Sequence, residues 1–272
     1  MGIVNVTPDS FSDGGRYFSS ASQSAAVFER CAQLVEEGAD ILDIGGESTR
    51  PGATPLLLGE ELARVLPVVR EAVRLGVPIS VDTYKPEVMQ AVLDLGADII
   101  NDIWALRQAG AQHVIAGHPA CGVCLMHMHG EPVSMQLAPM QGEVVAQVKV
   151  FLTERAAQLV ALGVDSRRVV LDYGIGFGKT VEQNFSLLAE QRGLAHLGYP
   201  LLAGWSRKSS LGAVAGNSVG ALPALSVLER MVPSVVAAVL AAERGARVLR
   251  VHDVRETVQA LKVWNAATRS IS

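Results

Sequence analysis

The segment Ile41-Leu42-Asp43-Ile44-Gly45-Gly46-Glu47-Ser48-Thr49-Arg50-Pro51-Gly52 introduces a pattern that recurs along the whole chain. Its short apolar run carries Asp43 and is stopped by two glycines, which predicts a buried strand. Glycines allow backbone N–H groups to approach a ligand, and the guanidinium of Arg50 suits a phosphate group. We therefore interpret the segment as a strand followed by a ligand-binding loop.

Composition limits the classes of protein to consider. The 272 residues suffice for one large α/β domain or two small ones. A net charge of −4, without a basic stripe interleaved with aromatic residues, argues against nucleic-acid binding. No apolar run is long enough to span a membrane, and we find no signal peptide. With only three cysteines, the chain is expected to be cytoplasmic.

A glycine-centred turn recurs after stretches of helical periodicity. Apolar residues at Phe28, Cys31, Ala32 and Val35 have the i, i+3, i+4, i+7 spacing of one helix face. A glycine just past a helix end readily takes the left-handed capping conformation. Each turn therefore predicts the end of a helix and the start of a strand. The glycines concerned are Gly38, Gly76, Gly96, Gly163, Gly198 and Gly245.

Eight short apolar runs are candidate strands, and helical stretches separate them. They are residues 2–6, 41–44, 79–81, 99–100, 123–126, 169–171, 201–203 and 248–251. Eight such βα units in about 250 residues predict a single-domain (β/α)₈ TIM barrel over residues 1–272, with parallel strands. A doubly wound open sheet is the alternative.

Polar side chains follow every one of these runs. They include Asn5, Asp43, Asp82, Asn101, Asp102, His127, Asp172, Ser206, Arg207, Lys208, Arg250 and His252. The C-terminal ends of parallel barrel strands meet at one rim, and active sites of such barrels lie there. We therefore expect an enzyme with its active site at the C-terminal rim.

The strand-end residues divide into two chemical groups. Hydrogen-bond acceptors, which suit a ligand presenting N–H donors, are Asp82, Asn101 and Asp172. Cationic and donor groups, which suit a phosphate or diphosphate, are Asn5, Arg50, Arg250 and His252. Lys208 can reach between the groups. Together they suit a reaction that breaks a bond from carbon to diphosphate, because one group stabilises the leaving anion and the other a developing cation.

Three further motifs are less specific. Residues 6–15 form a long polar loop, which we interpret as a lid over the active site. Residues 172–180 resemble a P-loop, but Tyr173 occupies the position where that motif needs glycine. Cys121 and Cys124 lie near several histidines, yet they flank the start of a strand and no second cysteine pair exists. We expect Cys124 to be buried in the core.

Several motifs, in order along nearly the whole chain, resemble the bacterial dihydropteroate synthase family of pterin-binding barrels. These motifs are residues 5–15, 43–52, 80–83, 100–103, 126–128, 174–179, 206–209 and 250–253. The resemblance implies a transferase of folate biosynthesis. It would condense 4-aminobenzoate with 6-hydroxymethyl-7,8-dihydropterin diphosphate, with Mg²⁺, through an SN1-like loss of pyrophosphate.

The resemblance also implies roles for individual residues. Pterin-binding residues would be Asp82, Asn101, Asp172 and Lys208. Diphosphate-binding residues would be Asn5, Arg50, Arg250 and His252, with Asn5 also a Mg²⁺ ligand. The aminobenzoate pocket would be formed by Phe11, Thr49, Pro51, Phe177, Lys208 and Ser209. Among these, Asp82, Lys208 and Arg250 would be catalytic. Sulfonamides would compete for the aminobenzoate pocket, and the enzyme would be a homodimer.

Three features depart from the family pattern. Tyr173 replaces a usual proline, His129 stands at a glutamine-like position, and the chain starts within its first strand, without a common short leader. Because strand side chains alternate, Tyr173 should point towards the surrounding helices if Asp172 faces the barrel mouth. A pterin-binding methyltransferase and a catalytically impaired homologue are the alternative functions.

Overall fold

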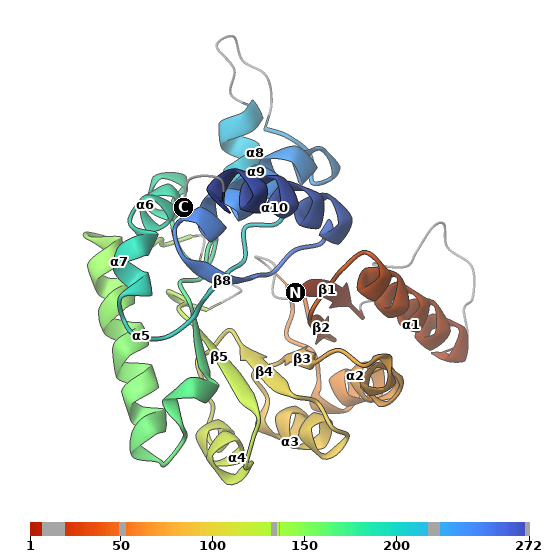
Figure 1. The fold of residues 1–272 in the computed structure, drawn as a ribbon. Helices are drawn as coiled ribbons and strands as arrows, with labels where there is room; N and C mark the ends of the chain where they lie inside the picture. Colours follow the sequence, from red (N-terminus) through yellow and green to blue (C-terminus); the bar gives the residue numbers. More distant parts are fainter. Residues whose placement is uncertain (7–19, 49–52, 132–134, 136, 217–223, 270–272) are drawn as a thin grey trace.

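A computed structural model describes residues 1–6, 20–48, 53–131, 135, 137–216 and 224–269. Parallel strands alternate with helices along this part of the chain (Figure 1). The strands are β1 Gly2–Asn5, β2 Leu42–Gly45, β3 Ile79–Asp82, β4 Ile99–Asp102, β5 Gly122–Met126, β6 Val169–Asp172, β7 Leu201–Ala203 and β8 Ala246–Leu249. All eight predicted strands are thus confirmed, with boundaries shifted by a few residues.

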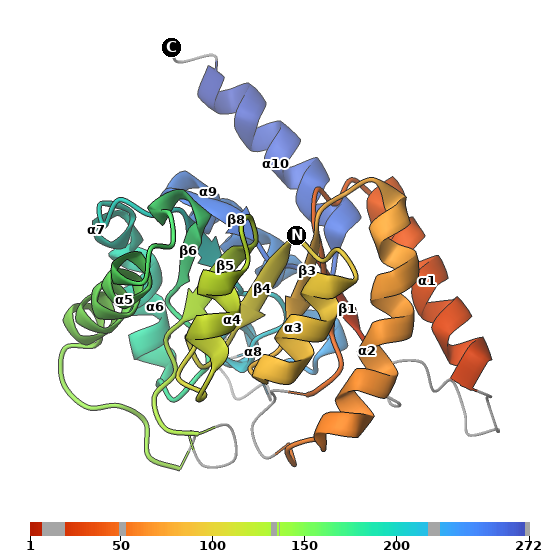
Figure 2. The ribbon, with the colours of Figure 1, turned by 90° about the horizontal axis from the view of Figure 1, so that it is seen from below.

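Helices follow the strands and cover the outer face of the sheet (Figures 1 and 2). They are α1 Ser20–Glu36, α2 Leu58–Ala72, α3 Pro86–Asp94, α4 Ala111–Gly117, α5 Val144–Ala161, α6 Val181–Ala189, α7 Gln191–Ala195, α8 Ser209–Gly216, α9 Met231–Glu243 and α10 Val254–Arg269. Short 3₁₀ helices occur at η2 Val73–Leu75, η3 Ser166–Arg168 and η4 Leu228–Arg230. None of the helices described is both long and apolar enough to cross a lipid bilayer.

The sheet has the strand order β1 to β8, with each strand parallel to the next. Beyond β8, Val251 forms an isolated parallel bridge with Gly2 of β1. The N–H of Val251 donates to the Met1 carbonyl at 3.0 Å, and the N–H of Ile3 donates to the Val251 carbonyl at 2.9 Å. The sheet therefore curls until its last segment lies beside its first, as expected for a (β/α)₈ architecture.

The repeated glycine turns have the predicted backbone conformation. Gly38, Gly76, Gly96, Gly163, Gly198 and Gly245 all have positive φ angles, between 75° and 99°. Residues with a Cβ atom adopt this region only with strain. The glycines therefore end each helix sharply and direct the chain into the next strand.

The helix predicted from the spacing of Phe28, Cys31, Ala32 and Val35 is confirmed as α1. Val27, Cys31 and Leu34 are fully buried, whereas Phe28 and Val35 are half-buried. The most deeply buried stripe of α1 therefore lies beside the one that the spacing picked out, and both stripes contain Cys31.

A close backbone approach fixes the turn after β6. Gly174 has a φ of +66°, and a Cβ atom there would lie 1.9 Å from the carbonyl oxygen of His127. No L-residue fits this position without movement of the chain. The two strand ends β5 and β6 are therefore held together directly through their backbones.

We expect Gly174→Ala to lower the free energy of unfolding by about 2–5 kcal/mol, the combined cost of a left-handed Ala and of overpacking. Gly76→Ala is the matched control. Gly76 also has a positive φ (+75°), but within the described part of the chain no atom beyond its chain neighbours lies within 4 Å of the place a Cβ would occupy. The control should lose only about 1–2 kcal/mol. Urea unfolding measures both losses, and equal losses would contradict the close contact.

Candidate active site

Three of the predicted site residues lie in one row across neighbouring strands. Asn5 of β1 is paired in register with Gly45 of β2, Gly45 with Asp82 of β3, and Asp82 with Asn101 of β4. Each of these residues is at or next to the C-terminal end of its strand. The structure therefore places Asn5, Asp82 and Asn101 side by side at this end of the sheet.

A buried carboxylate lies beneath this row. Asp43 is fully buried and accepts three hydrogen bonds. The donors are Ser80 Oγ at 2.6 Å, Asn101 Nδ2 at 3.1 Å and Arg250 Nε at 2.5 Å. The sequence reasoning placed Asp43 near a strand end but assigned it no role in the site, although its position in an apolar run was the available signal.

Arg250 joins the end of the chain to the first strands. Its Nη2 donates to Asp82 Oδ2 at 2.7 Å while its Nε donates to Asp43. Asp82 and Arg250 therefore lie at the same end of the sheet, as predicted. In this structure the guanidinium faces carboxylates, whereas the sequence predicted a diphosphate partner.

The fully buried Asp43 and the largely buried Asp82 both accept from the single guanidinium of Arg250. Burial raises the pKa of Asp82 to about 7; the charge of Arg250 opposes this shift, and the charge of Asp43 adds to it. Burial lowers the pKa of Arg250, but the charges of Asp43 and Asp82 outweigh it and the net shift is upward. Asp82 can therefore change protonation near neutral pH.

The second part of the site follows β6 and β7. Burial raises the pKa of Asp172, and the Gly174 N–H, which donates to its Oδ1 at 2.7 Å, opposes the shift. Burial lowers the pKa of Lys208 to about 8, and the charge of Asp172 opposes this. The Lys208 ammonium lies 4.3 Å from the centre of the Phe177 ring. The structure thus brings together Asp172, Phe177 and Lys208, as predicted.

Lys179 supports the loop that carries Phe177. It is almost fully buried, and its Nζ donates to the carbonyl of Gly174 at 2.8 Å and to those of His127 and Phe177 at 3.3 Å. Burial lowers its pKa to about 7. The sequence reasoning missed this role, although the glycine-rich run before Lys179 indicated a loop that needs a fixed shape.

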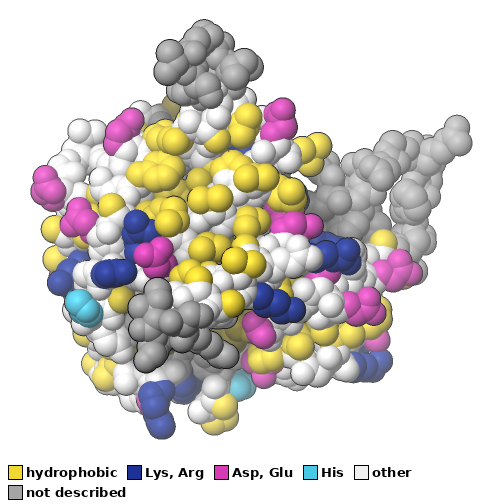
Figure 3. Space-filling model, turned by 45° about the horizontal axis from the view of Figure 1, so that its top comes forward, with side chains coloured by type: hydrophobic (Ala, Val, Ile, Leu, Met, Phe, Trp, Pro, Cys, Tyr) yellow, Lys and Arg dark blue, Asp and Glu magenta, His cyan; other side chains and the backbone are white. Residues whose placement is uncertain are grey.

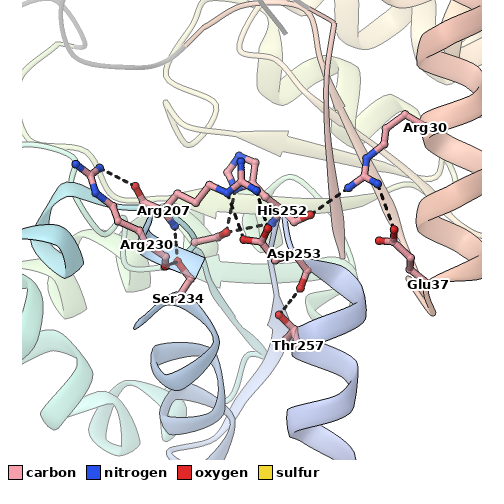
Figure 4. Close-up of polar contacts among 9 residues, drawn as sticks. Arg30, Glu37, Arg207, Arg230, Ser234, His252, Asp253 and Thr257 are labelled. Carbon is pink, nitrogen blue, oxygen red and sulfur yellow. Dashed lines mark hydrogen bonds and ion pairs between the residues drawn. The ribbon is translucent and has the colours of Figure 1, made fainter. Parts of the chain in front are cut away.

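His252 belongs to a polar cluster that links β7, β8 and α1 (Figure 4). Ser206 Oγ and His252 Nδ1 are 2.9 Å apart, and the backbone N–H of His252 donates to the same oxygen at 3.1 Å. Arg207 donates to both oxygens of Asp253, at 2.6 and 3.2 Å. Arg30 of α1 donates to the His252 carbonyl at 3.3 Å. This cluster fixes His252 beside the strand end that carries Arg250.

A third cluster holds the start of the loop after β2. Lys85 forms ion pairs with Glu47 and with Glu61 of α2, the latter at 2.5 Å. Tyr84 Oη donates to Glu47 Oε1 at 2.9 Å, and Thr83 Oγ1 donates to Glu61 Oε1 at 2.7 Å. No local pattern indicated this cluster, because its members come from three separate segments.

Four predicted residues, Phe11, Thr49, Arg50 and Pro51, lie outside the described residues, as does most of the predicted lid over residues 6–15. Ser209 is exposed at the start of α8. Cys121 and Cys124 are buried free thiols, which confirms core packing for Cys124. Within the described residues, no group of three or more His, Cys, Asp or Glu side chains could hold a metal ion.

The described site therefore combines carboxylate and amide acceptors with Lys208, Arg250 and His252 at the same ends of the strands. Acceptors of this kind suit a flat heterocycle with several N–H donors. Cations beside them suit an anionic leaving group. The geometry fits substitution at a carbon that carries a diphosphate.

Comparisons with known proteins agree with this chemistry. The profile of a family described as "Pterin binding enzyme" matches residues 1–252. The dihydropteroate synthase of Neisseria meningitidis serogroup B is 48% identical over 270 residues, which cover 98% of this chain and 91% of that protein. The chain belongs to the pterin-binding enzyme family, and specifically to its dihydropteroate synthases.

Solved structures have the same fold. The dihydropteroate synthase of Xanthomonas albilineans with 4-aminobenzoic acid has a TM-score of 0.88 and 49% identity, covering 98% of this chain and 92% of that chain. The Yersinia pestis dihydropteroate synthase in complex with a sulfonamide drug has a TM-score of 0.88 and 41% identity, covering 99% and 93%.

We expect Asp43→Asn to lower the free energy of unfolding by about 3 kcal/mol, because Asp43 accepts from Ser80, Asn101 and Arg250 and an amide keeps only one of its two acceptor oxygens. The new side-chain amide would also turn a donor towards existing donors. Asp40→Asn, at an exposed position three residues earlier, is the control and should change stability by less than about 0.5 kcal/mol. Chemical denaturation measures the free energy of unfolding of both variants. An unchanged value for Asp43→Asn would contradict the assigned hydrogen-bond network.

Proposed function

We propose that this chain joins 4-aminobenzoate to 6-hydroxymethyl-7,8-dihydropterin diphosphate, giving 7,8-dihydropteroate and pyrophosphate. It acts as one pterin-binding domain over residues 1–272, a closed (β/α)₈ barrel with the active site at the C-terminal rim. The observation that carries the proposal is the placement of Asp82 and Asn101 beside Arg250, together with Asp172 beside Lys208.

The pterin ring is held by Asp82, Asn101, Asp172 and Lys208. A pterin presents ring and exocyclic N–H groups, and carboxylate and amide oxygens accept from them. Lys208 donates to the pterin's own acceptors, and its nearness to Asp172 supports a shared ligand. Asp82 also faces the exocyclic methylene carbon, where positive charge develops.

The diphosphate is held by Asn5, Arg50, Arg250 and His252. A guanidinium has five N–H donors, and Asp43 and Asp82 take one at Nε and one at Nη2. Arg250 can therefore bind a diphosphate oxygen while it stays anchored to Asp43. This anchoring orients the guanidinium before the substrate arrives, which lowers the cost of reorganisation.

Mg²⁺ fits the donor chemistry at the end of β1. Mg²⁺ at phosphate sites is usually held by one or two protein oxygens together with phosphate oxygens and water. The half-buried Asn5, in register beside Asp82 through Gly45, offers an amide oxygen of this kind. Bound there, the ion would neutralise charge on the leaving pyrophosphate.

The reaction proceeds with SN1 character. The bond from the methylene carbon to the diphosphate oxygen breaks, the electron pair leaves with pyrophosphate, and ionised Asp82 stabilises the pterin cation. The amine of 4-aminobenzoate then forms the new C–N bond and releases a proton to solvent. Its pocket comprises Phe11, Thr49, Pro51, Phe177, Lys208 and Ser209.

A homodimer and a cytoplasmic location are part of the proposal. Exposed apolar side chains gather over α8, η4, α9 and α10 (Figure 3), including Val214, Leu228, Val236 and Val263. Large exposed apolar surfaces usually mark interfaces, and a second copy of the chain is the expected partner. The three cysteines are free thiols, which suits a reducing compartment.

The test is pyrophosphate release by the purified chain with Mg²⁺. Release should require both substrates together, and a sulfonamide should inhibit competitively against 4-aminobenzoate. Omission of 4-aminobenzoate is the control for simple hydrolysis of the diphosphate. Absence of dihydropteroate among the products, with the protein folded, would reject the proposal in favour of an impaired homologue.

We expect kcat/KM for the pterin diphosphate to rise with pH up to about 7, where Asp82 ionises, and to fall again above about 8, where Lys208 loses its proton. Below about pH 7 Asp82 is protonated and neutral, so it cannot stabilise a cation. Asp82→Asn should lower kcat/KM by about 10²–10³-fold, as for one lost preorganised group, and remove the rise with pH that Asp82 causes. The substrate titrates in the same way with both proteins. The ratio of their kcat/KM values at each pH therefore reports the titration of Asp82. A ratio independent of pH would contradict the assignment.

A further inference from the structure

Tyr173 lies directly behind the two residues that frame the pterin site. It follows Asp172 at the end of β6, and its side chain is fully buried. As predicted, the ring points away from the strand ends towards the helices, where its hydroxyl meets Gln191 of α7. Trp205, also buried, lies two residues past β7 and three residues before Lys208.

A continuous chain of hydrogen bonds runs through these side chains. Trp205 Nε1 donates to Tyr173 Oη at 3.3 Å, and Tyr173 Oη donates to Gln191 Oε1 at 2.7 Å. Gln191 Nε2 then donates to the carbonyl of Ala241 in α9 at 2.7 Å. The tyrosine hydroxyl is therefore both donor and acceptor in a fully buried network. It joins the segments after β6 and β7 to α7 and α9. Of these elements, β6, α7 and α9 lie on one side of the molecule (Figure 2).

The network acts where backbone pairing ends. The register between β6 and β7 comprises only Leu171 with Leu201 and Asp172 with Leu202. Strand β6 ends at Asp172, and beyond this pair side-chain hydrogen bonds link the segment after β6 to the segment that carries Lys208. The Tyr173–Trp205 hydrogen bond is the first such link beyond the last backbone pair.

A second buried link joins the same two segments from α6. Asn184 Oδ1 accepts from the Gly176 N–H at 2.9 Å, and Asn184 Nδ2 donates to Ser210 Oγ at 2.9 Å. Phe185, the next residue, packs its ring 5.2 Å from that of Trp205. The segments after β6 and β7 are therefore linked on two sides.

We propose that Tyr173 is a positioning residue that fixes the separation of Asp172 and Lys208 for pterin binding. This inference rests on the proposed function, since it assigns those two groups to one ligand. Both must meet the same flat ring, and hydrogen bonds weaken steeply once distance and angle depart from their optimum. Loss of the link would thus weaken pterin binding without changing any group that contacts the pterin.

The test is calorimetric binding of the pterin diphosphate, without 4-aminobenzoate, to Tyr173→Phe. This variant keeps the ring and removes only the hydroxyl. We expect Kd to rise about tenfold, equivalent to about 1.4 kcal/mol. The value of kcat with both substrates saturating should stay within about threefold, because reacting groups still align once the ligand is bound. Measurements are made well below the melting temperature of the variant.

Tyr199→Phe is the matched control, because Tyr199 precedes β7 at the opposite end of that strand. It should bind the pterin diphosphate like the unaltered protein. Trp205→Phe removes the donor of the same hydrogen bond. If Tyr173→Phe does not fold, Trp205→Phe is used in its place. In the double variant Tyr173→Phe/Trp205→Phe, the rise in Kd should be smaller than the product of the two single rises, because both residues belong to one network.

A lower melting temperature with an unchanged Kd in Tyr173→Phe or Trp205→Phe would overturn the inference, since a purely structural role predicts that result. Failure of the proposed function gives a different result. In that case the unaltered protein itself would form no dihydropteroate.

Discussion

The contact of Arg250 with Asp43 and Asp82 is the constraint on which the site depends. It connects the segment after β8 to β2 and β3, and through Asn101 it extends to β4. Asp43 and Asp82 both accept from one guanidinium, which orients Arg250, while burial raises the pKa of Asp82. The same contact reinforces the closure of the strand order, where Gly2 and Val251 form an isolated backbone bridge.

Around this contact, the loops of the site are supported from behind by buried polar groups. Lys179 holds the loop after β6 through three backbone carbonyls, and Lys85 holds the start of the loop after β2 through Glu47 and Glu61. Such groups are costly to bury, so they are stable only while fully hydrogen-bonded. The supporting network therefore fixes the described strand ends in place, and groups held in place orient a substrate with less loss of entropy on binding.

Much of this arrangement could be predicted from local patterns. The six glycine turns and eight apolar runs anticipated the strands, and the polar residues that follow them anticipated Asp82, Asn101, Asp172 and Arg250. The spacing of apolar residues also predicted helix α1, although it did not identify the most deeply buried stripe of that helix. The roles of Asp43 and Lys179 were missed. Asp43 depends on Ser80, Asn101 and Arg250, which lie 37 to 207 residues later in the chain. Lys179 depends on backbone carbonyls, including that of His127.

By itself, the sequence determined the order of strands and helices, the position of the helix ends, and which residue types meet at the strand ends. These features follow from local backbone preferences and from the common direction of parallel strands. Only the tertiary structure decided that Arg250 faces two carboxylates, that Tyr173 forms hydrogen bonds with Gln191 and Trp205, and that the pKa of Asp82 is raised. These outcomes depend on distances between residues far apart in the chain. They also depend on burial, which sets the strength of electrostatic interactions and the size of pKa shifts.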